Sequence, residues 1–306
     1  NERSSHRVPT PRGGGMAMAA VFVAALVLLG SMQLVSSRLL LVLLPAGILV
    51  AAAGWLDDHR TVAAPARLAI HLLAAAAGLY FLQYPPSLPL FGREITAGGW
   101  GYLVLATGLV WTVNLNNFMD GIDGIAAVEA VCVAVGISLV LWLNGGDMQS
   151  VRVLVLLAAV SAGFLYWNWP PARIFMGDAG SGFLGLTIGL LALETSAGAA
   201  VNLWSWCILY GVFIVDATYT LGQRIRRGER FFEAHRSHAY QILSRRLQSH
   251  LKITIGVGMI NICWLFPLAV VSSRYPSHGL MWAAVALAPL VALAAWAGAG
   301  KREVIE

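Results

Sequence analysis

Residues 100–143, WGYLVLATGLVWTVNLNNFMDGIDGIAAVEAVCVAVGISLVLWL, contain two long apolar runs joined by a short polar turn. The runs lie at about 100–117 and 124–143, and each is long enough to cross roughly 30 Å of hydrocarbon as a helix. Asp120 and Asp123 lie in the turn, and Asn114 and Asn117 lie just before it, so that four polar side chains follow one another at a spacing of three residues. The stretch therefore predicts two membrane-spanning helices that meet in an acidic connection.

The same pattern repeats along the whole chain. Apolar residues make up 58% of it and charged residues 11%, which is about half the charged fraction of an average soluble domain. Apolar runs of spanning length lie at about 16–35, 39–56, 65–84, 100–117, 124–143, 150–167, 181–199, 202–222, 252–271 and 279–297. We therefore predict an all-α polytopic membrane protein with about ten transmembrane helices, organised as a single integral-membrane domain over residues 1–306.

Three segments outside these runs have features of their own. Residues 1–15 are polar, basic and glycine-rich, without a signal-peptide pattern. They are interpreted as a cytoplasmic loop, which predicts a further span before Asn1. Residues 223–250 form a long basic loop, and the prolines and alternating apolar residues of 85–99 favour a short periplasmic β-hairpin.

Basic residues are distributed unequally between the two sides of the predicted bundle. Sixteen Lys and Arg fall on the side of residues 1–15 and 223–250, and four fall on the other side. The positive-inside rule makes the first side cytoplasmic. The net charge of +5 comes mainly from these residues, so it indicates contact with anionic membrane lipids and gives no support to nucleic-acid binding.

Five aspartates lie where predicted spans meet this cytoplasmic side: Asp57, Asp58, Asp120, Asp123 and Asp178. Acids at a lipid–water boundary are costly unless they bind a cation or pass protons. We therefore predict a chemical site at this face.

Asp57 and Asp58 close the span at 39–56, in the string GWLDDHR. Adjacent residues on a helix point about 100° apart, so one aspartate could face a metal ion while the other faces a second ligand. A helix-end pair bonded to His59 and Arg60 is the alternative interpretation.

The string NLNNFMDGIDGIAA, residues 114–127, places Asn114 and Asn117 three residues apart, and Asp120 and Asp123 likewise. Each pair would share a face of a continuing helix. Carboxylates and amides suit an oxygen-ligated cation such as Mg²⁺ and the hydroxyls of a sugar or ribose. A polar turn with helix-capping aspartates is the alternative.

The string PARIFMGDAGSGF, residues 171–183, places Asp178 between glycines at the start of an apolar span. Exposed N–H groups there, with Ser181, could hold phosphate oxygens. Asn168 and Arg173 lie just upstream, and Arg173 could clamp a phosphate. Alternatively Asp178 is an ordinary N-cap, since the P-loop pattern is absent.

The basic loop contains His235, Arg236 and His238 in EAHRSHAYQ. Histidines and arginines close to the acids would bind a nucleotide diphosphate through charge and hydrogen bonds. The positive-inside rule explains most of the arginines without that role, but not the histidines as well. Asp216 lies inside a predicted span, and both a structural role and membership of the site remain open for it.

Taken together, these strings resemble the polyprenyl-phosphate N-acetylhexosamine-1-phosphate transferases, which include the phospho-MurNAc-pentapeptide translocase and the initiating enzymes of O-antigen and teichoic acid assembly. The matching strings, in the family's order, are RSSHRVPTPRGGG, GWLDDHR, NLNNFMDGIDGIA, NWPPARIFMGDAGS and HRSHAYQ. The uninterrupted histidine cluster of the peptidoglycan translocases is absent from HRSHAYQ. The chain therefore looks more like the O-antigen-initiating members.

The resemblance and the residue patterns imply roles for twelve side chains. Catalytic roles are expected for Asp57, Asp58, Asp120 and Asp123. Metal binding is expected for Asp178 and Asp57. Substrate binding is expected for Asn117, Asn168, Arg173, His235, Arg236, His238 and Arg12.

The reaction implied by the resemblance joins a UDP-N-acetylhexosamine, with GlcNAc or a deoxy form such as FucNAc or QuiNAc, to undecaprenyl phosphate and releases UMP. It implies Mg²⁺, with Mn²⁺ as an alternative, and a multi-pass protein of the bacterial inner membrane whose site faces the cytoplasm. Membrane lipids are expected partners, and a homodimer is open. A transporter that uses acids as a proton or cation relay and a non-catalytic scaffold are the competing classes.

Overall fold

The computed structural model describes residues 10–82, 87–90, 93–96, 98–198, 200–229 and 235–301. The first half of the chain forms α1 (Gly14–Ser31), α2 (Ser37–His59), α3 (Ala64–Phe81), β1 (Ser87–Leu90), β2 (Arg93–Thr96), α4 (Gly99–Met119) and α5 (Ile125–Leu143). The second half forms α6 (Met148–Asn168), α7 (Gly177–Ser196), α8 (Leu203–Leu209), α9 (Gly211–Arg226), α10 (Ala239–Leu247), α11 (His250–Ile260), the π-helix η1 (Asn261–Leu265), α12 (Phe266–Arg274), the 3₁₀-helix η2 (Pro276–His278) and α13 (Gly279–Ala297).

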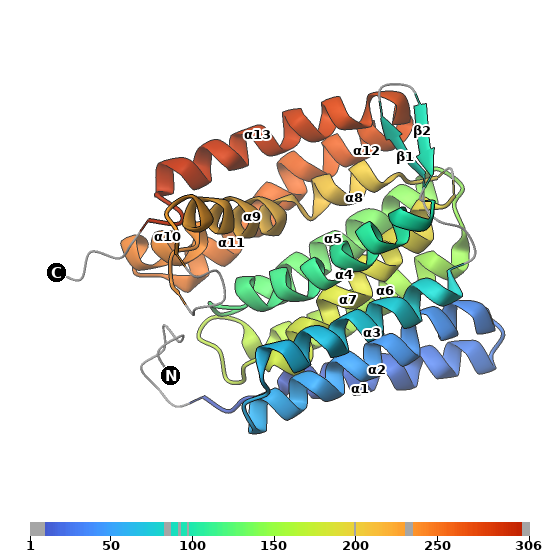
Figure 1. Cartoon of the computed structure of the whole chain (residues 1–306), viewed down its shortest axis with the longest axis horizontal. Coiled ribbons are helices and arrows are strands. Elements are labelled where there is room, and N and C mark those ends of the chain that lie inside the picture. Colours follow the sequence, from blue (N-terminus) through green and yellow to red (C-terminus); the bar gives the residue numbers. More distant parts are fainter. Residues whose placement is uncertain are drawn as a thin grey trace.

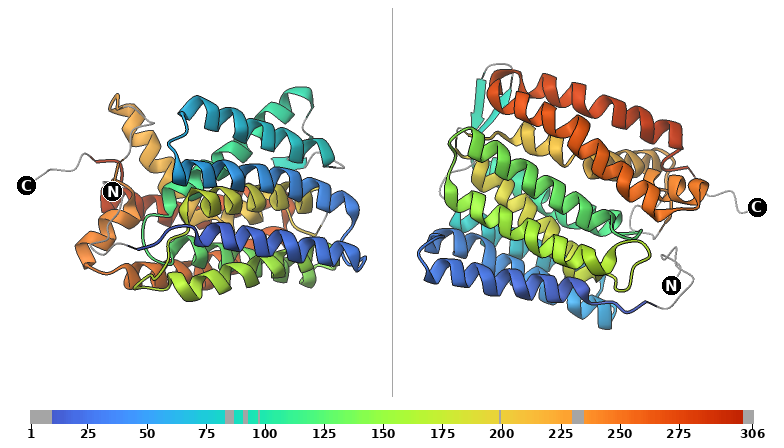
Figure 2. Two further views of the ribbon diagram at one scale, coloured as in Figure 1. Left: turned by 90° about the horizontal axis from the view of Figure 1, so that it is seen from below. Right: turned by 180° about the vertical axis from the view of Figure 1, so that it is seen from behind.

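The long helices run side by side in one bundle (Figure 1). Helices α1, α2 and α3 lie on one side of it and α12 and α13 on the other, with α4, α5 and α7 between them. The two further views in Figure 2 show the same arrangement. The end of α2, the end of α4 and the start of α7 lie at the end of the bundle that carries α10 (Figure 1). The strands β1 and β2 lie at the opposite end.

Each of the ten predicted spans coincides with a helix or a broken pair of helices, so the all-α prediction is confirmed for the described residues. The predicted number of spans is too high. Among the described residues, eight helices are long and apolar enough to cross a membrane, or nine if one bent pair counts as a span. That pair is α8 and α9, bent by 78°. Helix α4 is not among the eight, because three asparagines lower its mean hydropathy.

The predicted hairpin region contains two paired strands. Strands β1 and β2 are antiparallel, with Ser87 opposite Thr96 and Leu90 opposite Arg93. Parts of three predicted segments lie outside the described residues: 1–9 of the first loop, 85–86, 91–92 and 97 of the hairpin region, and 230–234 of the basic loop.

Helix α7 is the central helix of the bundle, and most of its side chains are buried. Glycines allow α1 and α2 to approach its first turns closely. A Cβ on Gly15 would lie 2.3 Å from the Cα of Gly180, and a Cβ on Gly54 would lie 2.4 Å from the carbonyl oxygen of Asp178. Because real Cβ atoms do not fit at such distances, these glycines bring the end of α2 directly against the start of α7.

Candidate active site at the end of the bundle

The start of α7 has no side-chain cap from its own sequence. Asp58, at the end of α2, supplies one instead, because its carboxylate accepts hydrogen bonds from the backbone N–H groups of Asp178 at 3.1 Å and Ala179 at 3.3 Å. A negative charge is favourable at this end of a helix. Gly177 has a φ of 76° and would carry a Cβ only 2.6 Å from the Asp58 carboxylate. Asp58 therefore fixes α2 to α7.

The neighbouring Asp57 faces different partners. Its carboxylate accepts from the backbone N–H of Val62 at 2.7 Å and from Nη1 of Arg67 at 2.6 Å. It also contacts the carboxyl group of Asp178. The two aspartates thus diverge, as the helix geometry predicts. The partners are Arg67 and the backbone, in place of the expected Arg60 and His59.

Asn117, near the end of α4, joins the same group of residues. Its Nδ2 donates to Oδ1 of Asp178 at 2.8 Å and lies 3.4 Å from Oγ of Ser181. The asparagine–aspartate string of α4 therefore contacts the start of α7. Segments 61 and more residues apart in sequence supply the polar groups of one small region.

Asp120 ends α4 beside these carboxylates and is partly exposed. Burial, followed by the negative charges of Asp178 and Asp58, raises the pKa of Asp120 well above its usual range. The positive charge of Arg12 opposes this effect. The carboxylates of this region therefore repel one another, and a bound cation would reduce that repulsion.

Arg12 is exposed and lies in a short extended segment that pairs with the chain before α7. Phe175 donates its backbone N–H to the carbonyl oxygen of Pro11 at 2.9 Å, and Gly14 donates to the carbonyl oxygen of Phe175 at 3.1 Å. These bonds bring the first loop to the site. A contact between Arg12 and a phosphate group stays a prediction, and this geometry allows it.

Asp123 and Asn168, by contrast, are buried and turned to protein groups. Asp123 accepts from the backbone N–H of Ala172 at 3.1 Å and lies 3.4 Å from Nδ1 of His250. Asn168 accepts from the N–H of Gly124 at 2.8 Å and donates to the carbonyl oxygen of Ile174 at 2.8 Å. In this structure both side chains hold the loops around the site in place.

His250 and Thr254 are residues of α11 that the sequence reasoning did not single out. Thr254 donates its hydroxyl to the carbonyl oxygen of Asp123 at 2.7 Å. These contacts attach α11 to the turn that follows α4. Nothing local in the string QSHLKIT points to this role, because the partner lies 131 residues away in the sequence.

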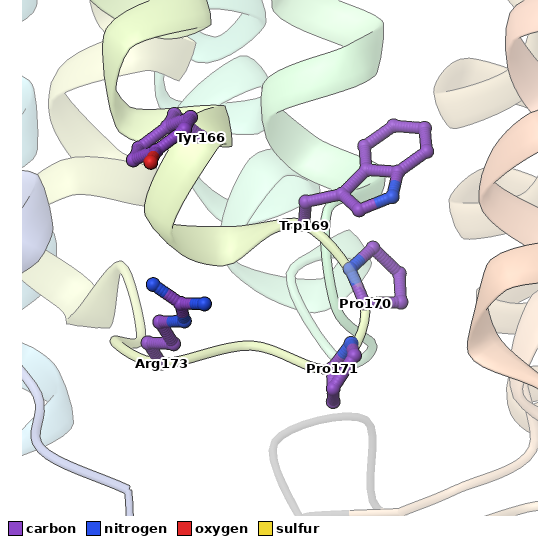
Figure 3. Close-up of a pocket in the computed structure, with 5 residues that line it drawn as sticks. All are labelled: Tyr166, Trp169, Pro170, Pro171 and Arg173. Carbon is purple, nitrogen blue, oxygen red and sulfur yellow. The ribbon is translucent and has the colours of Figure 1, made fainter.

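Arg173 lies on the loop after α6 and is exposed. It lines a shallow pocket together with Tyr166, Trp169, Pro170 and Pro171 (Figure 3). In that view its guanidinium group lies on the same side of the loop as Tyr166. The side chain is free to meet a ligand from the bundle end, and its phosphate role stays a prediction.

The loop that carries His235 and His238 packs against the end of α4 and the turn that follows it. His238 stacks on His235 with ring centroids 4.9 Å apart and on Phe118 at 6.2 Å. The hydroxyl of Tyr240 donates to the carbonyl oxygen of Phe118 at 2.9 Å. Arg236 accepts a hydrogen bond from Arg245 at its carbonyl oxygen, and its own Nε is buried without a partner among the residues that the structure describes.

The donor set fits a hard cation. In the part of the chain that the structure describes, no three His, Cys, Asp or Glu side chains come close enough to form a complete metal cage. Mg²⁺ rarely needs one, because it keeps several waters and is bound by one or two carboxylates together with substrate phosphates. Asp57 and Asp178, in mutual contact, match that requirement.

Comparison with known proteins agrees with this geometry. Residues 39–196, which include α2 to α7 and all five aspartates of the predicted site, match the model of glycosyl transferase family 4. The chain is 29% identical over 282 residues to a probable undecaprenyl-phosphate N-acetylglucosaminyl 1-phosphate transferase of Bacillus subtilis (strain 168), with 89% of this chain and 76% of that protein covered.

Two further relatives carry the names of different activities. The chain is 30% identical over 290 residues to a decaprenyl-phosphate N-acetylglucosaminephosphotransferase of Mycobacterium tuberculosis (strain ATCC 25618 / H37Rv), covering 83% of this chain and 70% of that protein. It is 33% identical over 233 residues to a phospho-N-acetylmuramoyl-pentapeptide-transferase of Synechococcus sp. (strain RCC307), covering 68% and 59%. The family resemblance predicted from the five strings is thereby confirmed, and this multi-pass membrane protein belongs to glycosyl transferase family 4.

Proposed function

We propose that this protein transfers N-acetylhexosamine 1-phosphate from a UDP-N-acetylhexosamine to undecaprenyl phosphate and releases UMP. It is a phospho-N-acetylhexosamine transferase that acts on a polyprenyl phosphate. The observation that carries the proposal is the convergence of Asp57, Asp58, Asn117 and Asp178 from three helices at one end of the bundle. The activities named for the relatives supply the reaction class.

The chemical difficulty of this reaction is the repulsion between two phosphate groups. Members of the family are generally Mg²⁺-dependent, and Asp178 and Asp57 are the residues that would hold the ion here. When bound, Mg²⁺ would neutralise charge on the diphosphate and polarise the bond that breaks. Arg12 would add a fixed positive charge at the same place.

The remaining residues of the site position these groups. Asp58 holds the start of α7, so it sets the place of Asp178 relative to α2. Asp120 is partly exposed beside them, and it would orient the lipid phosphate or the ribose. Since a phosphate monoester has its second pKa near 6, little base strength is needed at neutral pH. Direct displacement and a covalent phospho-aspartate both agree with this arrangement.

The sugar and the pathway are finer parts of the proposal. HRSHAYQ lacks the histidine cluster of the peptidoglycan translocases, and two of the relatives above are N-acetylglucosamine enzymes. We therefore favour GlcNAc or a deoxy form of it, in the first membrane step of O-antigen or a related envelope polysaccharide. Because a relative with N-acetylmuramoyl-pentapeptide activity also matches, that substrate belongs in the test. The arginine distribution supports a cytoplasmic site.

The competing transporter class predicts acids spread along the depth of the bilayer. Here the aspartates of the predicted site gather at one end, around the starts and ends of α2, α4 and α7. That distribution suits chemistry at the interface better than passage through the bundle.

The decisive experiment follows the β-phosphate of the nucleotide sugar. Purified protein in detergent is given undecaprenyl phosphate, Mg²⁺ and each of several UDP-N-acetyl sugars labelled with ³²P in the β-phosphate. The proposal predicts that the label moves to the lipid fraction while UMP is released, with one sugar preferred by rate. Label that stays in UDP would contradict the transfer of a sugar phosphate, and preference for UDP-MurNAc-pentapeptide would contradict the proposed sugar.

A further inference from the structure

Asp216 is a buried acid in α9 with four hydrogen-bond partners. Its Oδ1 accepts from the backbone N–H of Ala239 at 2.9 Å and from the hydroxyl of Thr220 at 3.1 Å, and it lies 3.3 Å from Nδ1 of His238. Its Oδ2 accepts from the backbone N–H of Tyr240 at 2.9 Å. One carboxylate of α9 therefore holds both the start of α10 and the histidine that precedes it.

Part of this arrangement is helix capping. The first N–H groups of a helix lack partners within the helix, and a carboxylate near them is favourable. Capping alone would be served by the two backbone bonds to Ala239 and Tyr240. The contact with the imidazole of His238 is additional, and it involves a side chain of the predicted substrate site.

The contact bears on which nitrogen of His238 carries a proton. In a hydrogen bond between these two side chains the carboxylate of Asp216 is the acceptor and Nδ1 of His238 is the donor. The ring plane is fixed by stacking on Phe118, His235 and Tyr240. Nε2 is then the ring nitrogen that does not face Asp216.

The position of His238 relates this pair to the reaction. Tyr240 reaches the carbonyl oxygen of Phe118, two residues before Asp120. A Cβ on Gly121 would lie 2.1 Å from the hydroxyl of Tyr240. The loop with His238 is therefore packed directly on the turn that carries Asp120.

We propose that Asp216 is a positioning residue that fixes the ring of His238 with Nδ1 protonated, so that Nε2 contacts the diphosphate of the nucleotide sugar. This inference rests on the proposed function for the identity of the ligand. The geometry of the Asp216–His238 pair is independent of it. Asp216 itself touches no substrate in this account.

The kinetic test compares Asp216→Asn with His238→Gln and with the double variant, by UMP release. We expect Asp216→Asn to lower kcat/KM for the nucleotide sugar by about 10–100-fold, the usual cost of losing an orienting partner. The double variant should be no worse than His238→Gln, because Asp216 acts through that ring. Glu194→Gln is the matched control: it removes the acid that pairs with Arg38 near the far end of α7 and should keep wild-type kinetics.

Two results would overturn the proposal: wild-type kcat/KM in a folded Asp216→Asn variant, or an equal loss from Asp216→Asn in the His238→Gln background. A separate spectroscopic measurement on the wild-type protein needs no Asp216 variant. In ¹⁵N-histidine-labelled wild-type protein, with the His238 signal assigned from His238→Gln, the neutral ring should be protonated at Nδ1. Protonation at Nε2 alone would contradict the proposal. Failure of the wild-type enzyme to release UMP would contradict the proposed function and leave this spectroscopic result standing as its own test.

Discussion

Two acidic regions of the molecule differ in what their oxygens contact. At the end of the bundle, Asp58 accepts from a backbone N–H group of α7, and Asp57 accepts from a backbone N–H group and from Arg67. Each of these three residues is partly exposed. Inside the bundle, Glu129 of α5 is only 1% exposed. Its Oε2 accepts from Nδ2 of Asn261 at 2.7 Å, at the first residue of the π-helix η1.

The difference distinguishes an acid that can reach a ligand from an acid that only holds two helices together. Among the described residues, Oε1 of Glu129 and Oδ1 of Asn261 are both buried without a hydrogen-bond partner, on the same pair of residues. A carboxyl group that keeps its proton could donate from Oε1 to that amide oxygen. The acids at the bundle end have fixed positions together with an approach from outside. We therefore expect substitutions at the two regions to affect different quantities.

The largest effect should come from Asp178→Asn. The change keeps the size of the side chain and an oxygen that can accept from Asn117, but removes a charge from the proposed metal site. We expect UMP release to fall by at least about 100-fold, the scale of losing one electrostatic group of an active site. Thermal unfolding should change little. Asp147→Asn, which keeps an N-cap at α6, is the control, and activity equal to that control would remove Asp178 from the site.

A smaller effect, and on stability, is expected for Glu129→Ala. The change removes one of the two acceptors of Nδ2 of Asn261, which keeps its bond to the carbonyl oxygen of Val257 at 3.1 Å. Loss of a buried hydrogen bond to a charged or polar partner costs about 1–3 kcal/mol of unfolding free energy. Glu129→Gln keeps a donor and an acceptor in the same place and should be close to wild type. Activity per folded molecule should be preserved in both. Unfolding in detergent, followed by circular dichroism, measures the difference, and a greater loss for Gln than for Ala would contradict this account of the pair.

The smallest effect is expected for Arg67→Ala. The side chain of Arg67 is 36% exposed, whereas that of Asp57 is 7% exposed. Since exposed ion pairs contribute about 0–1 kcal/mol, the unfolding free energy should change by no more than that. Asp57 keeps its bond from the Val62 N–H, so UMP release should fall only a few-fold. A loss as large as that of Asp178→Asn would show that Arg67 itself belongs to the reacting groups.

Much of the fold can be predicted from the sequence because apolar runs of spanning length have few alternatives. Each predicted run coincides with a helix or a broken pair. The bend of 78° between α8 and α9 lies in an apolar string without proline and could not be predicted. The π-helix η1 begins at Asn261, shortly before Pro267, whose missing N–H is a local signal for a break in a helix. Both features depend on partners in other helices, such as Tyr210 with Asn116 and Asn261 with Glu129.

The sequence names candidate members of the site, whose roles stay predictions, but it does not give their contacts. Short strings place Asp57, Asp58 and Asp178 at the same interface, because helices of spanning length alternate direction. Which atom meets which partner depends on tertiary approach. The seam at Gly54 turns Asp58 toward the N–H groups of α7, and Asn168 is turned to the backbone. No local string gives the pairing of Asp216 with His238, 22 residues away.

The most direct test of the central claim, that the acids at the bundle end form a cation-dependent transferase site, is UMP release by the purified wild-type protein under four conditions. UDP-GlcNAc is supplied with or without undecaprenyl phosphate, each after treatment with EDTA and after restoring Mg²⁺. The account predicts UMP only when lipid and Mg²⁺ are both present. Equal release without the lipid, or release that persists in EDTA, would contradict it.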